Sequence, residues 1–434
     1  MTTETLFLAH RLPFPPNKGD KIRSFALLKH LATLGPVNLG CFVDDSEDLK
    51  YLDEVRALAG GECLFTRLGA TTKWSRATLA ILMGQPITTA YFGSRSLESW
   101  VGQMLRRKTL ERIVVFGSAM APYLLNKKPE CDRVLFDMVD VDSDKWRQYA
   151  AASRGPLRWI YAREAHALEH LEREAVRQFG KTLLVSHFEA ETFRALAPER
   201  ASKIEALNNG VDLANFSPDG NLDNPFSPGE RAIVMTGRMD YRPNYAGAIW
   251  FIKKVAPFVF ERLPDAHLYF VGSNPPSALR HLTSPRITVT GSVEDVRPYI
   301  QHAAAVIAPL QMARGVQNKV LEAMAMKKPV VATHEATRAL GVMNGRHLWI
   351  ENEPVHFADA VVRACQPAAN LSVIENARQY VEEHHDWSGI FHVLDGYLAE
   401  LQSSTPSDAN AQRTICDKDS RALARSHEGS RLRA

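Results

Sequence analysis

The chain has 434 residues, of which 45% are hydrophobic and 23% are charged, and this composition indicates a folded protein of two or three domains. Its formal net charge of +3 is too small to indicate a nucleic-acid partner. The five cysteines form no CxxC pair and no apolar run reaches the ~18 residues of a membrane span, so we expect a cytoplasmic protein without a disulfide framework, a zinc site or a signal peptide.

Short apolar runs typical of buried parallel strands alternate with segments of helical periodicity. In the first half we expect strands at 6–10, 37–43, 63–68, 113–116, 134–139, 182–185 and 204–207. In the second half we expect strands at 232–236, 267–271, 287–290, 304–308, 330–332 and 348–350, with helices between them that include 245–263 and 318–326. This alternation predicts an α/β protein with two doubly wound, Rossmann-like parallel-sheet domains.

The stretch 208–230 is dense in Gly, Pro, Asn and Asp, which predicts a linker between the two domains. A helix near 387–401 closes the fold, and the chain beyond it has too few large apolar residues to order itself. The sequence thus predicts an N-terminal domain at 1–207, a C-terminal domain at 208–385, a closing helix at 386–402 and a disordered tail at 403–434.

Three motifs with known chemistry are missing from the sequence. No GxGxxG follows a strand, which disfavours a dinucleotide-binding dehydrogenase. No GxxxxGK[ST] and no HExxH occur either, and the sequence has no paired metal-ligand spacing. We therefore expect no metal site and no cofactor.

The segment 314–333 predicts a polar loop, a helix that begins near Asn318, and a buried strand. The N-terminus of a helix attracts anions through its unpaired N–H groups, and Gly315 lets the backbone approach such an anion. Lys319 adds a positive charge, and Glu322 lies one turn further on the same helix face, where a carboxylate can bind a ribose diol. The pattern predicts a nucleotide-diphosphate site, and the alternative is an ordinary solvated Lys/Glu pair.

The same segment resembles the C-terminal signature of family 4 glycosyltransferases. Residues 320–325 and 329–333 match its V-L-E-A-M-A and P-V-V-A runs, and 208–218 resembles the family's N-G-V-D entry to the second domain. The pair Gly237 and Arg238 resembles the phosphate-contacting turn, and 289–300 resembles the base-contacting segment through Gly291 and Val293. The resemblance extends to about residue 401 and implies a GT-B fold, in which two domains face a cleft.

The resemblance implies a retaining, metal-independent transferase that uses a UDP or GDP sugar. Arg238 and Lys319 would stabilise the leaving diphosphate, and Glu322 would hold the ribose. The predicted donor-binding residues are Gly237, Arg242, Gly291, Val293, Arg314, Gly315, Asn318 and Glu322.

The chain departs from the family pattern at two positions. Arg314 stands where the family has the first glutamate of its Glu-x7-Glu motif. An arginine cannot accept hydrogen bonds from sugar hydroxyls, so a carboxylated sugar or the diphosphate becomes its expected ligand. The lysine that usually follows the Gly-Arg turn is missing, and either Arg242 replaces it or Lys319 acts alone.

On the acceptor side, the loop after the first strand carries Lys18, Gly19, Asp20 and Arg23 and predicts a second anion-binding turn, with a basic surface turn as the alternative. Asp137, Asp140 and Asp142 follow a strand at the sheet edge where α/β proteins bind ligands. We expect Asp140 to orient or deprotonate an acceptor hydroxyl, against the alternative of a turn with capping residues. His187 follows another strand and is expected either to face the cleft or to be structural.

More narrowly, the runs at 13–25, 137–146 and 315–326 resemble sugar transferases of PEP-CTERM/exosortase systems, which are linked to exopolysaccharide production. The resemblance implies a glycan or lipid-linked acceptor. The basic-then-apolar segment 73–84 and the basic run 106–112 predict peripheral contact with the cytoplasmic face of the inner membrane, or else a core helix with a basic entry.

Two rival functions fit the same fold. A non-catalytic GT-B scaffold of a polysaccharide assembly complex would explain the loss of the first glutamate at Arg314. A sugar-nucleotide epimerase would share the donor site and need no acceptor side. Retention of Arg238, Lys319 and Glu322 favours the transferase over the scaffold.

Overall fold

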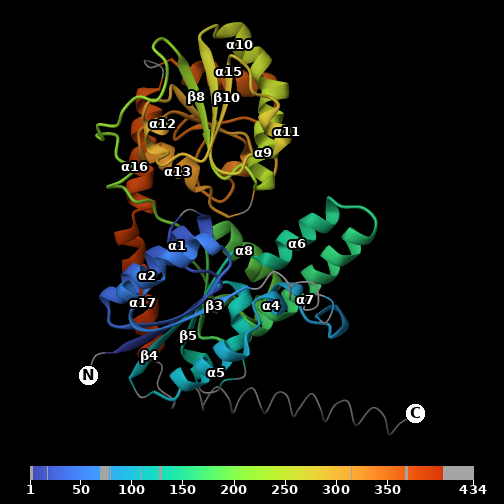
Figure 1. The fold of residues 1–434 in the computed structure, drawn as a ribbon, viewed down its shortest axis with the longest axis vertical. Helices are drawn as coiled ribbons and strands as arrows, with labels where there is room; N and C mark the ends of the chain where they lie inside the picture. Colours follow the sequence, from blue (N-terminus) through green and yellow to red (C-terminus); the bar gives the residue numbers. More distant parts are fainter. Residues whose placement is uncertain are drawn as a thin grey trace.

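The computed structural model describes residues 3–16, 18–68, 78, 80–107, 109–125, 127, 130–313, 315–366 and 370–403. Within these ranges the strands form two parallel sheets, which Figure 1 shows as a lower N-terminal and an upper C-terminal domain. The predicted tail beyond residue 403, Arg314, and residues 73–77 and 79 of the predicted membrane segment lie outside the described residues.

The N-terminal sheet has the order β3-β2-β1-β4-β5-β6-β7. Its strands are β1 (Glu4–Ala9), β2 (Val37–Val43), β3 (Gly60–Arg67), β4 (Leu110–Phe116), β5 (Val134–Val139), β6 (Lys181–Leu184) and β7 (Ile204–Ala206). Its helices are α1 (Gly19–Thr33), α2 (Leu52–Ala59), α4 (Ile87–Tyr91), α5 (Arg95–Met104), α6 (Asp142–Ala151), α7 (Pro156–Gln178) and α8 (His187–Leu196). Short 3-10 helices are η1 (Ser46–Tyr51), η2 (Ser118–Tyr123), η3 (Glu130–Arg133) and η4 (Pro198–Lys203). Figure 1 shows α6 and α7 projecting together from the side of this domain.

The C-terminal sheet has the order β10-β9-β8-β11-β12-β13. Its strands are β8 (Arg231–Thr236), β9 (Ala266–Val271), β10 (Ile287–Gly291), β11 (Ala305–Ala308), β12 (Val330–Ala332) and β13 (Trp349–Ile350). Its helices are α9 (Arg242–Trp250), α10 (Ala256–Arg262), α11 (Ser277–Arg280), α12 (Arg297–Gln301), α13 (Asn318–Ala325), α14 (His334–Thr337), α15 (Pro354–Ala364) and α16 (Leu371–His384).

The two sheets confirm the doubly wound prediction, and each predicted strand is present with shifts of a few residues at its ends. In both sheets the chain first builds outward from the starting strand and then reverses. The topological switch points therefore lie between β1 and β4 and between β8 and β11. In such sheets ligands bind outside the carboxyl ends of the strands at the switch point.

The helix predicted at 245–263 is continuous in space but not regular. It begins earlier as α9, passes through a π-helical turn at Phe251–Val255, and continues as α10. Pro257 sits in the first turn of α10, where it lacks the N–H that a regular helix would use. The wider turn accommodates this proline without ending the helix.

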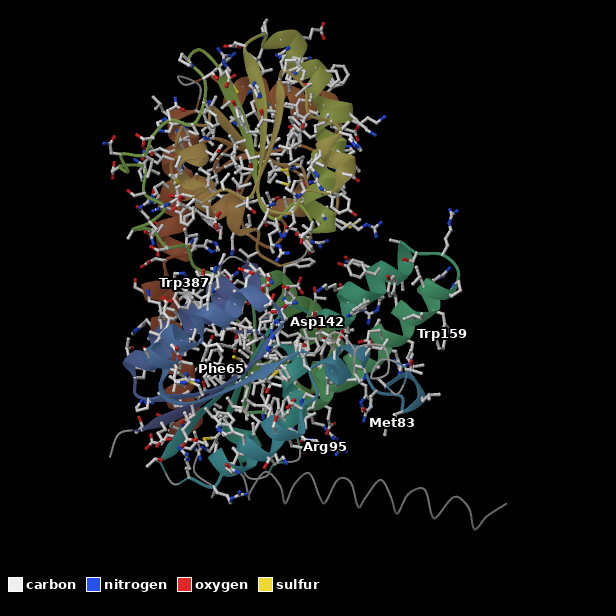
Figure 2. The ribbon with its side chains drawn as sticks, in the orientation of Figure 1. Phe65, Met83, Arg95, Asp142, Trp159 and Trp387 are labelled. Atoms are coloured by element: carbon white, nitrogen blue, oxygen red, sulfur yellow. The ribbon has the colours of Figure 1, made fainter. Side chains whose placement is uncertain are left out.

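The closing helix α17 (Trp387–Ser403) packs on the N-terminal domain, although it follows the C-terminal one in sequence. Its Ile390, Leu394, Leu398 and Leu401 join the same apolar cluster as strand residues of β1, β2 and β4. The chain thus crosses between the domains twice, near 208–211 and near 385–387, where Figure 2 labels Trp387. The Trp387 ring lies against Gly210, since a Cβ on Gly210 would be 2.4 Å from it.

We predict that Leu394→Ala destabilises the N-terminal domain by ~2–5 kcal/mol, because it leaves a cavity in the packed interior. Leu394 is 1% exposed, whereas its neighbour Val393 is 44% exposed and serves as the control. Hydrogen exchange should show lost protection in β4 and β5 for Leu394→Ala and little change for Val393→Ala. Loss confined to the C-terminal sheet would contradict this assignment of α17.

Candidate active site

The carboxyl edge of the C-terminal sheet is built from close-packed backbone turns. Gly237, directly after β8, has φ 136°, and its N–H donates to the carbonyl of Val271 at 3.0 Å. A Cβ on Gly272 would lie 1.9 Å from the Gly237 carbonyl oxygen, so only glycine fits there. The N–H of Gly272 donates to the carbonyl of Gly291 at 3.2 Å. Two of the predicted donor-binding glycines, Gly237 and Gly291, thus form one rim without side chains.

Lys319 lies on this rim. Its Nζ donates to Oδ1 of Asn244 at 2.5 Å, and a Cβ on Gly237 would be 2.8 Å from the same nitrogen. The other end of the Asn244 amide donates to the carbonyl oxygen of Arg238 at 2.8 Å. Asn244 therefore fixes the lysine and the Gly-Arg turn together, a role that the sequence analysis missed. The only sequence signal is an Asn in the first turn of the helix that follows that turn.

Glu322 follows Lys319 by one turn of α13. Among the described residues its carboxyl has no hydrogen-bond partner. Burial raises the pKa of Glu322 to about 7, against the lowering effect of the Lys319 charge. Burial likewise lowers the pKa of Lys319 to about 8, against the raising effect of Glu322. The pair is therefore a desolvated site in which both charges gain from a ligand that supplies partners.

Arg238 points toward the N-terminal domain. Its Nε donates to Oδ1 of Asp240 at 3.1 Å, and this bond is the main cause that raises the pKa of Arg238. The charges of Arg11 and Asp20 also act on Arg238, so the residues at the end of β1 lie across the cleft from it. The structure brings the predicted leaving-group cations Arg238 and Lys319 to the same strand edge.

Asp140 and Gly315 meet across the two domains. Gly315 has φ 60°, and a Cβ on it would lie 2.5 Å from Oδ1 of Asp140. The residue before Asp140 is Val139, a β-branched residue at φ 70°, which is a strained conformation. The strained turn at the end of β5 thus directs Asp140 onto the loop that precedes α13.

Arg23 and Asp137 do not fit the acceptor-loop role predicted for them. Both side chains are 1% exposed, and Nε of Arg23 donates to Oδ2 of Asp137 at 2.7 Å. Burial raises the pKa of Asp137 while the Arg23 charge opposes that rise. Arg23 also donates to Oδ1 of Asn209 at 3.0 Å, and the Asn209 amide donates to Oδ1 of Asn318 at 3.3 Å. These contacts give Arg23 and Asp137 a positioning role instead, and they place Asn318 in a chain of contacts between the domains.

The other charged side chains of the predicted acceptor loop are paired with residues of the N-terminal domain. Asp20, in the first turn of α1 beside Gly19, accepts hydrogen bonds from Arg11 and from His10. Burial alone would raise the pKa of Asp20, but these partners hold it well below its ordinary value. Lys18 Nζ is 3.9 Å from Asp44. These contacts favour the surface-turn alternative over an anion-binding turn.

Glu189, in the first turn of α8, is a buried carboxyl that the sequence analysis missed. It accepts a hydrogen bond from the N–H of Val141 at 3.2 Å. Burial first, and the charge of Asp140 second, raise the pKa of Glu189 to about 7. Phe188 precedes Glu189 in α8. The guanidinium of Arg338, from the C-terminal domain, lies 4.6 Å from the centre of the Phe188 ring. His187 begins α8 and is exposed, and the contact between Phe188 and Arg338 brings the start of α8 to the interdomain region.

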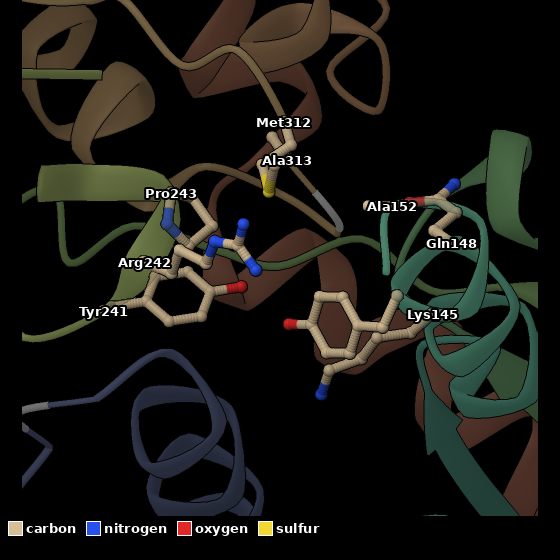
Figure 3. A pocket seen from close by; sticks show the side chains of 9 residues that line it. Lys145, Gln148, Ala152, Tyr241, Arg242, Pro243, Met312 and Ala313 are labelled. Atoms are coloured by element: carbon tan, nitrogen blue, oxygen red, sulfur yellow. The ribbon is translucent and has the colours of Figure 1, made fainter. Parts of the chain in front are cut away.

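A pocket opens between the domains beside the Asp140 contact (Figure 3). Figure 3 shows Lys145 and Gln148 of α6 on one side, with Tyr241, Arg242 and Pro243 at the start of α9 on the other. Arg242 lines this pocket, whereas Asn244 is the residue that contacts Lys319 and the Gly-Arg turn. The full lining is Lys145, Gln148, Tyr149, Ala152, Tyr241, Arg242, Pro243, Met312 and Ala313.

Val293 lies in the loop after β10 and packs against the C-terminal core as a partly buried side chain. In the described part of the chain, no cluster of three or more His, Cys, Asp or Glu side chains could hold a metal ion. None of the described helices is both long and apolar enough to cross a membrane.

Residues 230–366 match the family model described as glycosyl transferases group 1. This range contains β8 to β13 together with Lys319 and Glu322. The match is confined to the C-terminal domain and covers less than half of the chain.

One relative is a protein of Klebsiella pneumoniae named as an uncharacterized 44.6 kDa protein in the cps region. The two chains are 25% identical over 175 residues, which cover 37% of this chain and 44% of the relative. The match thus spans less than half the length of either protein.

Solved structures resemble nearly the whole chain. HepE of Anabaena in complex with UDP and glucose has a TM-score of 0.62 at 13% identity, and the match covers 92% of this chain and all 100% of that one. WaaG, a glycosyltransferase involved in lipopolysaccharide biosynthesis, has a TM-score of 0.63 at 16% identity and covers 90% and 98%. Sucrose-phosphate synthase from Thermosynechococcus elongatus has a TM-score of 0.65 at 16% identity and covers 93% and 100%. At these identities the likeness establishes the fold, which is the expected GT-B architecture.

If Lys319 and Glu322 bind a nucleotide, as the sequence predicts, their shifted pKa values predict how that binding depends on pH. Lys319 holds its proton below about pH 8, and Glu322 is ionised above about pH 7. Affinity for a nucleoside diphosphate should therefore be highest between these values and fall by up to about tenfold per pH unit on either side. Titration calorimetry across pH measures this profile.

Two variants separate the limbs of the profile. Lys319→Arg should remove the alkaline limb, because a guanidinium keeps its proton there. Glu322→Gln should remove the acidic limb. A flat profile in the unaltered protein, or limbs that neither variant changes, would contradict the assignment of the two groups.

Proposed function

We propose that this protein is a glycosyltransferase that moves a sugar from a UDP- or GDP-type donor to a glycan or lipid-linked acceptor. The observation that carries the proposal is the pair Lys319 and Glu322 at the rim of Gly237. One partly buried cation beside a backbone turn suits a diphosphate, and one partly buried carboxyl without a hydrogen-bond partner among the described residues suits a vicinal diol. The group 1 family match over the same residues supports this assignment.

In the proposed reaction the bond between the sugar and the diphosphate breaks, and negative charge builds on the departing phosphate oxygen. Lys319 and Arg238 lie where they would stabilise that charge, held by Asn244 and Asp240. Removing one such preorganised group typically costs ~2.7–4 kcal/mol of barrier. These cations supply the countercharge that a divalent metal would otherwise provide, so we propose a metal-independent mechanism. We also propose that the configuration at the anomeric carbon is retained, on the basis of the resemblance to family 4 glycosyltransferases.

On the acceptor side we propose that Asp140 orients the attacking hydroxyl. It is the predicted acidic residue that reaches the loop before α13, as its contact with Gly315 demonstrates. Burial first, and the charge of Asp140 second, raise the pKa of Glu189 to about 7, so Glu189 is the second carboxyl that we propose for the acceptor side.

We place the activity in exopolysaccharide biosynthesis. The relative named for the cps region and the structural neighbour named for lipopolysaccharide biosynthesis support this setting. The three motifs that resemble PEP-CTERM/exosortase-associated transferases favour an exopolysaccharide pathway of that system.

We also propose peripheral contact with the cytoplasmic face of the inner membrane. Leu82, Met83, Leu157 and Trp159 are 79%, 61%, 53% and 62% exposed. Arg163 donates hydrogen bonds to the carbonyls of Ala80, Ile81 and Gln85 and so joins their two segments. Figure 2 shows Met83 and Trp159 on the same side of the N-terminal domain. We name Leu82, Met83, Leu157 and Trp159 the apolar patch.

The first test of the proposal is titration calorimetry with UDP, GDP and ADP. We expect one nucleotide to bind saturably and Glu322→Ala to weaken it by about tenfold or more, since a hydrogen bond to a charged group contributes ~1.5–3 kcal/mol. Glu261→Ala is the control, because Glu261 is an exposed glutamate of α10 far along the chain from the site. If folded protein binds none of the three, the scaffold alternative replaces the transferase.

A second test addresses the apolar patch. Co-sedimentation with vesicles containing anionic lipid should bind the protein, and a Leu82→Ser, Trp159→Ser double variant should lose most of that binding. Leu371→Ser is the control, because Leu371 is 67% exposed on α16 of the other domain. Equal binding by both variants would remove the patch from the proposal.

A further inference from the structure

The pocket between α6 and the start of α9 has a different lining from the donor rim, which is formed by Gly237, Gly291 and Lys319. Its lining offers two cations, Lys145 and Arg242, and two phenol rings, Tyr149 and Tyr241. The donor rim instead offers backbone turns and a single buried lysine. A concave surface that combines cations with aromatic faces suits a ligand that has both an anionic group and a flat apolar face.

Neither cation makes a hydrogen bond or a short ion pair with a described residue, although the charges of Asp142 and Asp140 act on Lys145. The nearest acidic oxygen to Nζ of Lys145 is that of Asp142 at 3.9 Å, which is too long for a hydrogen bond. Arg242 is exposed and has no ion pair or hydrogen bond among the described residues. Figure 3 shows the Arg242 side chain between Tyr241 and Met312, on the pocket side of α9. Both groups are therefore available to an anion.

The ring of Tyr149 at the pocket wall is positioned by contacts with two other aromatic rings. The ring of Tyr149 lies 5.8 Å from that of Trp146 and 6.1 Å from that of Tyr161, with an edge-on and a tilted geometry. These contacts hold Tyr149 on α6 at the pocket wall. Tyr241 faces it from the other domain and is 43% exposed, so its ring is accessible to a ligand in the pocket.

The pocket adjoins the place where the sugar would be transferred. The charge of Asp140 acts on Lys145, whose pKa is raised by Asp142 and Asp140 in spite of its burial, and it also acts on Tyr241. Met312 and Ala313 line the pocket from the same loop that continues to Gly315, against which Asp140 lies. A ligand in the pocket would thus lie next to the reacting centre and not on the nucleotide side of it.

We propose that this pocket is an acceptor subsite that selects a saccharide carrying a carboxylate or a phosphate. Lys145 and Arg242 bind the anionic group, and Tyr149 and Tyr241 contact the sugar ring. The inference rests on the proposed transferase function and deepens it by naming the acceptor class. It also gives Arg242 a ligand other than the donor.

The test uses three small probes at millimolar concentration: methyl glucuronoside, glucose 6-phosphate and methyl glucoside. Saturation-transfer NMR and calorimetry measure their binding to the full chain in the presence of the nucleotide that binds best. We expect the two anionic probes to bind at least about tenfold tighter than the neutral glucoside, because a charge-assisted hydrogen bond is roughly twice as strong as a neutral one. The stronger anionic probe distinguishes a uronic acid from a sugar phosphate.

Two variants assign the effect to the pocket. Lys145→Gln should reduce the preference for anions by about tenfold while nucleotide affinity stays unchanged. Tyr149→Ala should weaken the charged and the neutral probes alike, because it removes a contact with the ring. Rescue of anion preference by Lys145→Arg guards against a mere loss of folding.

Three results would overturn the proposal. Equal binding of all three probes would remove the anion selectivity. Binding of a nucleotide without binding of any probe would remove the subsite and leave the transferase function intact. A loss of nucleotide affinity in Lys145→Gln equal to the loss of anion affinity would assign the pocket to the donor. Failure of the transferase function itself would appear separately, as the absence of nucleotide binding.

Discussion

The arrangement of the cleft depends on one buried ion pair, that between Arg23 and Asp137. Arg23 comes from the first helix and Asp137 from the fifth strand, and both are closed off from water. Nη1 of Arg23 donates to the carbonyls of Leu207 and Asn208 and to Oδ1 of Asn209. A buried charge needs its partner, and removing one member of such a pair typically costs ~3–5 kcal/mol. The pair therefore fixes where the chain leaves the first domain.

The point where the chain leaves the first domain also contacts the start of α13 in the second domain. Asn209 continues from Arg23 to Asn318, the first residue of the helix that carries Lys319 and Glu322. On the other side of the same strand end, Asp140 lies against Gly315. Lys319 and Glu322, which we propose bind the donor, and Asp140, which we propose orients the acceptor, are thus set relative to each other by one short set of contacts around β5. Arg338 over Phe188 adds a further contact between the domains.

Much of the fold could be predicted from the sequence because buried parallel strands are continuous apolar runs, and a pattern of that kind is local. Lys319 and Glu322 could be found for the same reason, since one helical turn brings them to one face. The pairing of Arg23 with Asp137 joins residues that are 114 positions apart, and no local pattern contains it. A basic loop residue and a buried arginine are alike in sequence, and only the tertiary packing distinguishes them.

The same limit applies to Asn244, Glu189 and the interdomain pocket. Asn244 and Glu189 each lie in the first turn of a helix, where polar residues are common for capping alone. Their roles depend on what approaches them from other elements, namely Lys319 in one case and Asp140 in the other. The pocket joins α6 to α9 across the domain boundary, so neither half of its lining has a motif that reveals the other.

The return of α17 to the first domain has a consequence for synthesis of the protein. Ile390, Leu394, Leu398 and Leu401 complete an apolar cluster whose other buried members lie at or before Leu207 in the chain. While the chain emerges from the ribosome, one face of β4 and β5 stays uncovered until the second domain has been translated. The N-terminal domain therefore lacks this part of its core until α17 has been made, although its strands are made first.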